Sequence, residues 1–231
     1  SKVRPDDLLS EVLKALANRT GIDTATIDEV YAGCGNQAGE DNRDVARMAS
    51  LLAGFPTEVP GVTINRNCAS ALDAVNAAAR TIAIGEGNLC IGSGVECMSR
   101  APFVMGKPER VPTNQAPKLW DTTVGWRFNN PKMDAMYPII SLGETAENIA
   151  QEMQITRAEQ DAFALESQNR AVAAINAGKF KDEITPISVP SRKDDPIVVD
   201  TDEHIRARND NGVFSVDTDL EVWGQSRPAF T

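Results

Sequence analysis

Histidine is almost missing from this chain, and aromatic side chains are scarce. The 231 residues include one histidine, His204, and only 5 % Phe, Trp and Tyr. Protein zinc sites are built mainly from histidine and closely spaced cysteine, and the four cysteines of this chain form no CxxC pair. The sequence therefore predicts neither a metal centre nor a disulfide framework. The cysteines are Cys34, Cys68, Cys90 and Cys97.

Positive charge and long apolar runs are also in short supply. The formal net charge is -10, so the surface as a whole repels the phosphates of nucleic acids and of anionic bilayers. No apolar run approaches the roughly 18 to 20 residues that span a bilayer, and charges interrupt the opening SKVRPDDLL, unlike a signal peptide. We expect a cytoplasmic protein that binds neither nucleic acid nor membrane.

Helical and β-type patterns alternate through the first part of the chain. Apolar residues recur at helical spacing in three segments, and short apolar or β-branched runs lie between these segments. This alternation is typical of a mainly parallel sheet with helices packed on it, so the expected fold class is α/β. The predicted helices are 5–21, 45–54 and 69–85, and the predicted strands are 30–34, 62–64 and 89–91.

The periodicity vanishes from residue 106 to residue 140. This segment has five prolines and most of the tryptophan, and a structureless stretch of that length is typical of a lid or a binding element. Its five basic and three acidic residues point weakly to an anionic ligand, although a solvated loop would carry such charges too. Two helices then follow, at 146–153 and 157–178, the second preceded by a Thr156–Glu159 capping box. Strands are predicted at 187–189 and 197–199, and no element is predicted after residue 202.

Cys68 lies between a predicted strand and a predicted helix, in INRNCASALDAVNAAARTIAIGEG, residues 64–87. A sulfur at a helix start lies near the first backbone N–H groups, which favour the reactive thiolate form. The same groups can bind the oxyanion that develops when a thiolate attacks a carbonyl. On spacing alone, an inert packing role is the more ordinary alternative, because free cysteine is among the most buried residue types. That packing role is the one expected of the other three cysteines.

Several longer motifs resemble the thiolase family. The segment around Cys68, with GSGVECMSRAPFVMGK after it, is similar to the family's nucleophile region, which reads close to VNRxCxSGLxA and GGxESMSxAP. GETAENIAQEM and TRAEQDAFALESQ resemble the family's sequence after its substrate-covering loop, and the similarity extends from residue 1 to about 206. Within the family, GCGNQAGEDNRDVARMASLLAG and DTTVGWRFNNP look most like 3-oxoadipyl-CoA thiolases.

The resemblance implies an acyl transfer in which Cys68 attacks a 3-oxoacyl-CoA, releases acetyl-CoA and passes the acyl group to a second CoA. CoA and acyl-CoA are then substrates, and no cofactor or metal is implied. Three further residues match family binding positions, although these matches are less specific than the motif around Cys68. Leu142 stands where many members have an acyl-pocket methionine, Met133 falls in the loop that covers pantetheine, and Arg206 matches an arginine that contacts the CoA nucleotide.

The resemblance also implies a domain plan. Residues 1–105 correspond to one αβα half of the five-layered thiolase architecture without its first strand, and residues 106–231 to a covering-loop and linker region. The family's GHP histidine, its CxGGG cysteine and a water-holding asparagine belong to a C-terminal half that this sequence does not contain. His204 is not expected to replace that base, so this chain alone is expected to be inactive. Full-length relatives are expected to be homodimers or homotetramers.

Two other enzyme activities and one non-catalytic role remain open as alternatives. A biosynthetic acetoacetyl-CoA thiolase and a ketoacyl synthase would use the same nucleophile, although GETAEN and the long loop favour a thiolase. A fragment without the base and the second cysteine could instead bind acyl-CoA without turnover. For a dicarboxylic acyl chain, Arg127 in the covering loop is the candidate partner of the far carboxylate, because arginine binds carboxylates through two parallel bonds. Arg127 as an ordinary surface arginine is the alternative.

Overall fold

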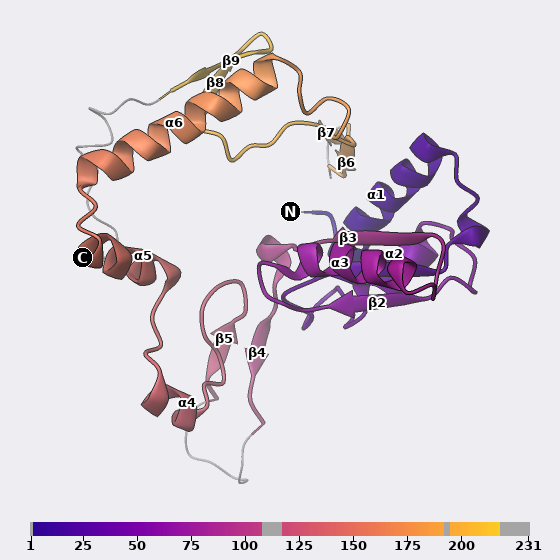
Figure 1. Ribbon diagram of the computed structural model, residues 1–231, viewed down its shortest axis with the longest axis horizontal. Coiled ribbons are helices and arrows are strands. Elements are labelled where there is room, and N and C mark those ends of the chain that lie inside the picture. The colour runs from indigo at the N-terminus through magenta and orange to yellow at the C-terminus, as the bar shows by residue number, and fades with distance from the viewer. Residues whose placement is uncertain (1, 108–116, 192–194, 218–231) are drawn as a thin grey trace. The chain divides into compact units, whose positions relative to one another are not determined.

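A computed structural model describes residues 2–107, 117–191 and 195–217 (Figure 1). The chain divides into two compact units. The first comprises Ser1–Asn129 and Ile187–Val199, and the second comprises Asn130–Pro186 and Asp200–Thr231. In the described part of the chain, no helix is both long enough and apolar enough to cross a membrane.

The first unit is built on a three-stranded parallel sheet. Its strands are β1 (Glu29–Gly33), β2 (Gly61–Ile64) and β3 (Cys90–Gly94), in the order β2-β1-β3. Val30 pairs with Gly61 on one side and with Ile91 on the other. The helices of this part are α1 (Pro5–Thr20), α2 (Val45–Leu52) and α3 (Ser70–Ala83). The α/β class and the parallel sheet predicted from the alternating pattern are confirmed.

The central strand β1 presents opposite faces to different helices. Its residues Val30 and Ala32 are fully buried in a core that includes Leu9 and Leu13 of α1 and Val45 of α2. Side chains alternate between the faces of a strand, so Tyr31 and Gly33 point the other way. The Tyr31 hydroxyl lies 2.7 Å from Thr81 Oγ1 of α3. This arrangement is an αβα sandwich, as expected.

Glycines in the sheet allow α3 to pack very closely. A Cβ at Gly33 would lie 2.2 Å from the Ala71 backbone nitrogen, and one at Gly92 would lie 2.7 Å from Val75 Cα. A Cβ at Gly94 would meet Ala71 Cβ at 2.6 Å. Since real Cβ atoms do not approach so closely, the three glycines set the distance between this helix and the sheet.

The face of α3 that is buried differs from the expected one. The larger apolar residues repeat along one helical side, which predicts a core face there. Instead, α3 buries the small residues Ser70, Ala74 and Ala78, and Leu72 and Val75 remain 64 % and 49 % exposed. The reason is steric, because the glycine-lined sheet leaves room only for small side chains. Large apolar side chains of α3 are thereby left partly exposed.

The predicted structureless segment 106–140 contains regular elements. Strand β4 (Phe103–Met105) pairs antiparallel with β5 (Leu119–Asp121), and a short helix α4 (Pro131–Met136) belongs to the second unit. Trp120 packs on Phe128 with ring centroids 4.6 Å apart. Aromatic packing thus orders residues whose spacing carries no periodic signal. The first unit also includes two short 3-10 helices, η1 (Thr24–Thr26) and η2 (Met98–Arg100). It further includes the antiparallel pair β6 (Ile187–Val189) and β7 (Ile197–Val199).

The second unit is mainly helical. Helix α5 (Leu142–Glu152) begins with a Ser141–Glu144 capping box, and α6 (Arg157–Asn176) begins with the predicted Thr156–Glu159 box. The strands β8 (Ala207–Asp210) and β9 (Val213–Val216) form a hairpin where the sequence predicts no element. The side chain of Asn176 joins this hairpin to α6, because it donates to the Phe214 carbonyl at 2.7 Å and accepts from the Phe214 N–H at 2.9 Å.

Candidate active site

Cys68 lies in the short turn that connects β2 to α3. The turn begins directly after Ile64, the last residue of β2, and ends at Ser70, the first residue of α3. Cys68 is a free thiol and its side chain is exposed to solvent. The structure therefore excludes the buried packing role for this cysteine and places its sulfur where a ligand can reach it.

The turn is held by side chains at both of its ends. Asn65 Oδ1 accepts a hydrogen bond from the Asn67 N–H at 2.9 Å, and Asn67 has a left-handed conformation with φ +49°. The Ser70 hydroxyl donates to the Asn67 carbonyl at 2.6 Å and accepts from the Arg66 N–H at 2.8 Å. These bonds give the backbone on the N-terminal side of Cys68 a defined path into the helix.

The ends of the neighbouring strands meet beside this turn. Glu96, just after β3, accepts hydrogen bonds from the backbone N–H groups of Gly35 at 2.8 Å and Asn36 at 3.3 Å. Asn65, just after β2, donates through Nδ2 to the Gly35 carbonyl at 2.8 Å. The carboxyl ends of parallel strands are the usual place of ligand sites in α/β folds. Here they bring Cys68 next to a hydrogen-bonded backbone network.

The other cysteines have different surroundings. Cys34 is 2 % exposed, and burial raises the pKa of its thiol to about 12. Burial also raises the pKa of Cys90, with the negative charge of Asp28 adding to the effect. Cys97 is half-buried, with Sγ 3.7 Å from the Val3 carbonyl oxygen. Of the four thiols, only that of Cys68 is exposed.

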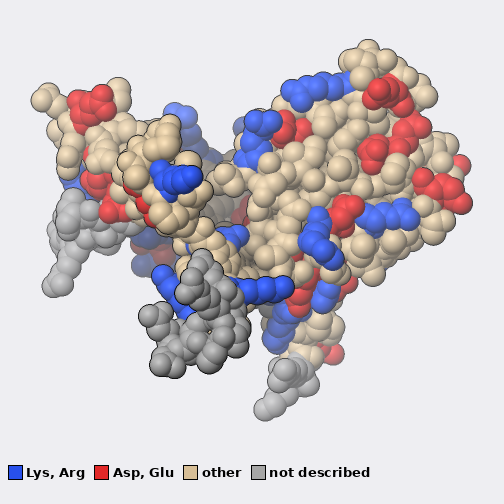
Figure 2. Space-filling view, turned by 90° about the horizontal axis from the view of Figure 1, so that it is seen from below, with Lys and Arg blue, Asp and Glu red and all other residues tan. Residues whose placement is uncertain are grey.

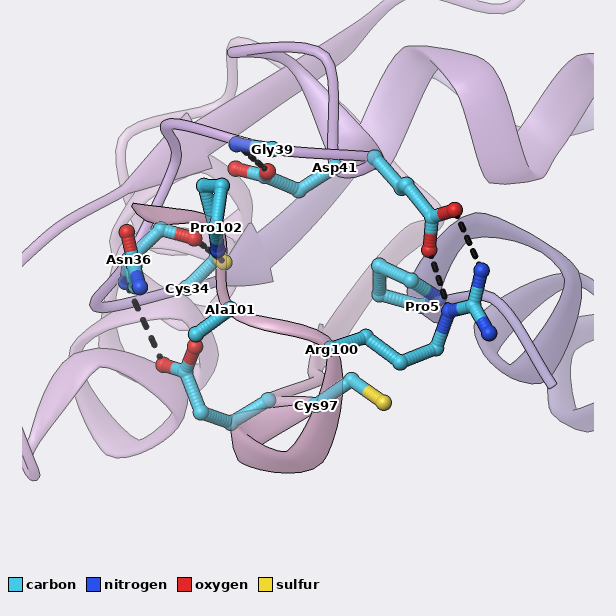
Figure 3. A pocket seen from close by; sticks show the side chains of 11 residues that line it. Pro5, Cys34, Asn36, Gly39, Asp41, Cys97, Arg100, Ala101 and Pro102 are labelled. Atoms are coloured by element: carbon cyan, nitrogen blue, oxygen red, sulfur yellow. Dashed lines mark hydrogen bonds and ion pairs between the residues drawn. The ribbon is translucent and has the colours of Figure 1, made fainter. Parts of the chain in front are cut away.

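A small cavity lies beside Cys34 (Figure 3). Its walls include Cys34, Asn36, Asp41 and Arg100, and its volume is about 20 Å³, room for a single water molecule. Burial raises the pKa of Asp41, whereas the hydrogen bond from Arg100 lowers the pKa of Glu40. Cys68 does not line this cavity, and an acyl-CoA is far too large for it.

The remaining predicted binding residues fall in both units. Arg127 is partly exposed and belongs to the first unit, like Cys68. Met133 on α4, Leu142 at the start of α5 and Arg206 before β8 belong to the second unit, and all three side chains are exposed. The Arg206 backbone N–H donates to Gln168 Oε1 of α6 at 3.0 Å. Each residue is therefore accessible within its own unit.

The electrostatic setting is mixed. Lys and Arg side chains lie among Asp and Glu side chains over the visible face in Figure 2. His204 is exposed in the turn before β8, and among the described residues no group of three or more His, Cys, Asp or Glu side chains is placed to hold a metal ion.

The family model described as the thiolase N-terminal domain matches residues 1–215. The chain belongs to the thiolase family. A beta-ketoadipyl-CoA thiolase of Pseudomonas aeruginosa is 51 % identical over 229 residues, which cover 99 % of this chain and 54 % of that thiolase. The 3-oxoadipyl-CoA/3-oxo-5,6-dehydrosuberyl-CoA thiolase of Escherichia coli is 50 % identical over 207 residues, covering 89 % of this chain and 51 % of that enzyme.

A solved thiolase-family structure has the same fold. The crystal structure of the Bacillus anthracis acetyl-CoA acetyltransferase superposes with a TM-score of 0.84 at 33 % identity, covering 99 % of this chain and 54 % of that one. The chain thus spans about half the length of the thiolases it matches. Both the family resemblance and the thiolase-like half predicted from the motifs are confirmed.

Sequence reasoning missed the side chains that brace the turn. Asn65, Ser70 and Glu96 all lie within the motifs that carry the resemblance, but only their contacts reveal what they hold. One signal was available in the sequence, because Asn two residues before another Asn is typical of an Asx-turn. The partnership of Glu96 with Gly35, which are 61 positions apart, had no local signal.

Proposed function

We propose that Cys68 is the nucleophile of a thiolase reaction in the whole protein. The observation that carries the proposal is the position of Cys68, which is exposed on the turn that leads into the N-terminus of α3. A helix N-terminus favours negative charge nearby, which suits both a thiolate and the oxyanion formed by its attack. Neither Cys34 nor Cys90 meets these conditions, since neither is exposed and burial raises the pKa of both thiols.

The proposed reaction has two covalent steps. The Cys68 thiolate attacks the 3-keto carbon of a 3-oxoacyl-CoA, the bond between C2 and C3 breaks, and its electron pair leaves as the enolate of acetyl-CoA, which takes up a proton. The shortened acyl group remains on Cys68 as a thioester. The thiolate of a second CoA, after its thiol gives up a proton, attacks that thioester, and the products are the shortened acyl-CoA and free Cys68.

The two proton transfers require groups outside the residues of this sequence. By the family resemblance, we propose that the histidine and the second cysteine of a C-terminal half supply them, with CoA as substrate and no cofactor. Met133 and Leu142 would line the covering loop and the acyl pocket, and Arg206 would contact the CoA nucleotide. In this scheme residues 1–105 form the N-terminal half and residues 106–231 the covering loop and linker of a homodimeric or homotetrameric enzyme.

The exposed apolar side chains of α3 support this domain plan. Leu72, Val75 and Ile82 are 64 %, 49 % and 46 % exposed on the same helix, and large apolar side chains in such a row favour contact with another surface. In the proposed whole enzyme, the C-terminal half of the duplicated architecture covers them.

We propose 3-oxoadipyl-CoA as the substrate. The support is that the beta-ketoadipyl-CoA thiolase of Pseudomonas aeruginosa and the Escherichia coli thiolase are 51 % and 50 % identical to this chain, against 38 % for an acetyl-CoA acetyltransferase of Pseudomonas aeruginosa. The far carboxylate of such a substrate needs a cationic partner, and Arg127 is the proposed one. A biosynthetic acetoacetyl-CoA thiolase remains the second candidate, because the Bacillus anthracis acetyl-CoA acetyltransferase superposes over the same extent of the chain.

The test of the nucleophile is thioester exchange with acetyl-CoA. The Cys68 thiolate should take the acetyl group and release the CoA thiolate, which takes up its proton from water, so a slow exchange proceeds without the groups of a C-terminal half. Peptide mapping of the treated chain is expected to find acetyl on Cys68 before Cys97, and Cys68→Ser should abolish that signal. Equal acetylation of Cys68 and Cys97 would overturn the proposal.

A further inference from the structure

We propose that Asn65 and Ser70 are a pair of positioning residues that set the reactivity of Cys68. This inference rests on the proposed function, in which Cys68 is the nucleophile. It concerns residues that touch neither the thiol nor, by the proposed scheme, the substrate. Their effect is exerted through Asn67, the residue directly before Cys68.

Asn67 is held at both of its backbone polar groups. Its N–H donates to Asn65 Oδ1 at 2.9 Å, and its carbonyl accepts from the Ser70 hydroxyl at 2.6 Å and from the Ser70 N–H at 3.1 Å. The residue has φ +49°, a left-handed conformation that side-chain-bearing residues seldom adopt without local support. Asn65 and Ser70 therefore support the conformation that turns the chain from β2 into α3.

Ser70 is suited to this role because it is buried. Its side chain is 4 % exposed, and its one hydroxyl serves as donor to Asn67 and as acceptor from the Arg66 N–H at 2.8 Å. The backbone of Ser70 also lies against β1, where a Cβ at Gly33 would come within 2.2 Å of the Ser70 carbonyl carbon. The turn is thereby tied to the sheet as well as to the helix.

Asn65 ties the same turn to the neighbouring strand. Its Nδ2 donates to the Gly35 carbonyl at 2.8 Å, and the Gly35 N–H is held in turn by Glu96 Oε2 at 2.8 Å. The Glu96 carboxylate after β3, the Gly35 peptide after β1 and the Asn65 side chain after β2 thus form one chain of hydrogen bonds that ends at Asn67. A thiol on the next residue keeps one position relative to the first N–H groups of α3 only while this linkage persists.

The test is the rate of Cys68 alkylation by iodoacetamide in this chain, measured relative to Cys97 in the same molecules. We expect Asn65→Ala and Ser70→Ala each to slow Cys68 labelling about two- to fivefold, the range that corresponds to losing a helix-terminus interaction at an exposed site. Asn65→Ser keeps a hydroxyl that can accept from the Asn67 N–H and should recover part of the rate. Asn76→Ala, an exposed asparagine on the same helix, is the matched control and should leave the rate unchanged.

Cys34 reports folding in every sample. A variant whose Cys34 stays unlabelled has kept its core, so slower Cys68 labelling in that variant reflects positioning and not unfolding. Labelling of Cys68 in both alanine variants at the rate of Asn76→Ala would overturn the inference, and so would an Asn65→Ser variant as slow as Asn65→Ala. Failure of the proposed function is distinct, because it would show as missing acetylation of unmodified Cys68 by acetyl-CoA.

Discussion

Cys34 and Cys68 both follow strands of the parallel sheet yet have opposite surroundings. Cys34 follows β1 and Cys68 follows β2 after a few residues, both at the carboxyl end of the parallel sheet. The Cys34 thiol is 2 % exposed, belongs to the core cluster of the first unit and donates to the Asn36 carbonyl at 3.3 Å. The chain around Cys68 enters a helix through a left-handed residue, and the thiol stays open to solvent.

The difference shows that the end of a parallel strand is not in itself a reactive position. The residues that pack around the position decide whether a cysteine there becomes part of the core or of a site. Burial in the core raises the pKa of the Cys34 thiol, whereas the turn before α3 leaves the Cys68 thiol accessible to solvent. The difference between the two cysteines can be tested by measuring turnover, the rate of cysteine alkylation and the free energy of unfolding.

The largest expected effect concerns turnover. The chain alone should cleave acetoacetyl-CoA at least about four orders of magnitude more slowly than a chimera in which the C-terminal part of the Pseudomonas aeruginosa relative follows this chain. The reason is that two proton transfers lack their groups, and each contributes roughly a hundredfold or more. Thiolysis is followed by the loss of 3-oxoacyl-CoA absorbance, with Cys68→Ser in the chimera as the inactive control. Comparable rates for chain and chimera would show that Cys68 works without those groups.

The next effect compares the two thiols directly. At pH 8, Cys34 should be alkylated about a thousandfold more slowly than Cys68, because a pKa of about 12 leaves very little thiolate. Since the folded-state pKa of Cys34 is raised, its labelling should increase about tenfold for each pH unit while the fold persists. Iodoacetamide labelling with peptide mapping measures both rates. Faster alkylation of Cys34 than of Cys68 would contradict the prediction that Cys68 is the more reactive thiol.

A smaller effect is expected at Arg127. In the chimera, Arg127→Ala should lower kcat/KM for 3-oxoadipyl-CoA about ten- to a hundredfold, since a charge-assisted hydrogen bond is lost. Acetoacetyl-CoA has no far carboxylate, so its turnover should change little. Arg157→Ala on α6 is the control arginine, because its partner is Asp161 on the same helix. Equal losses on both substrates would remove Arg127 as the carboxylate partner.

The smallest effect concerns the packing that places α3 beside Cys68. Gly94→Ala should lower the free energy of unfolding by about 1 to 3 kcal/mol, because the new methyl group would lie 2.6 Å from Ala71 Cβ. Adding Ala71→Gly removes that contact and should restore part of the stability. Urea unfolding of the two single variants and the double variant measures the coupling. Additive losses would mean that the two positions do not share this space.

Much of the first unit can be predicted from local patterns. The helices α1 and α2 and the strands β1, β2 and β3 match the periodic segments within a few residues, because each buries one face at the spacing of its own structure. Where tertiary contacts set the outcome, the local pattern is insufficient. It predicts the wrong buried face of α3, and it predicts neither the β4–β5 nor the β8–β9 hairpin.

The motifs around Cys68 are sufficient to identify the family and to select one cysteine from four. The amino-acid sequence alone carries this information, because Cys68, the proposed nucleophile, lies with the turn residues and the helix start within one short segment. The surroundings of each thiol, in contrast, depend on the folded chain. The Asn65–Gly35–Glu96 linkage joins residues that follow three different strands, and the burial of Cys34 depends on segments distant in sequence. Such contacts form only when parallel strands align, since their carboxyl ends then meet at one edge of the sheet.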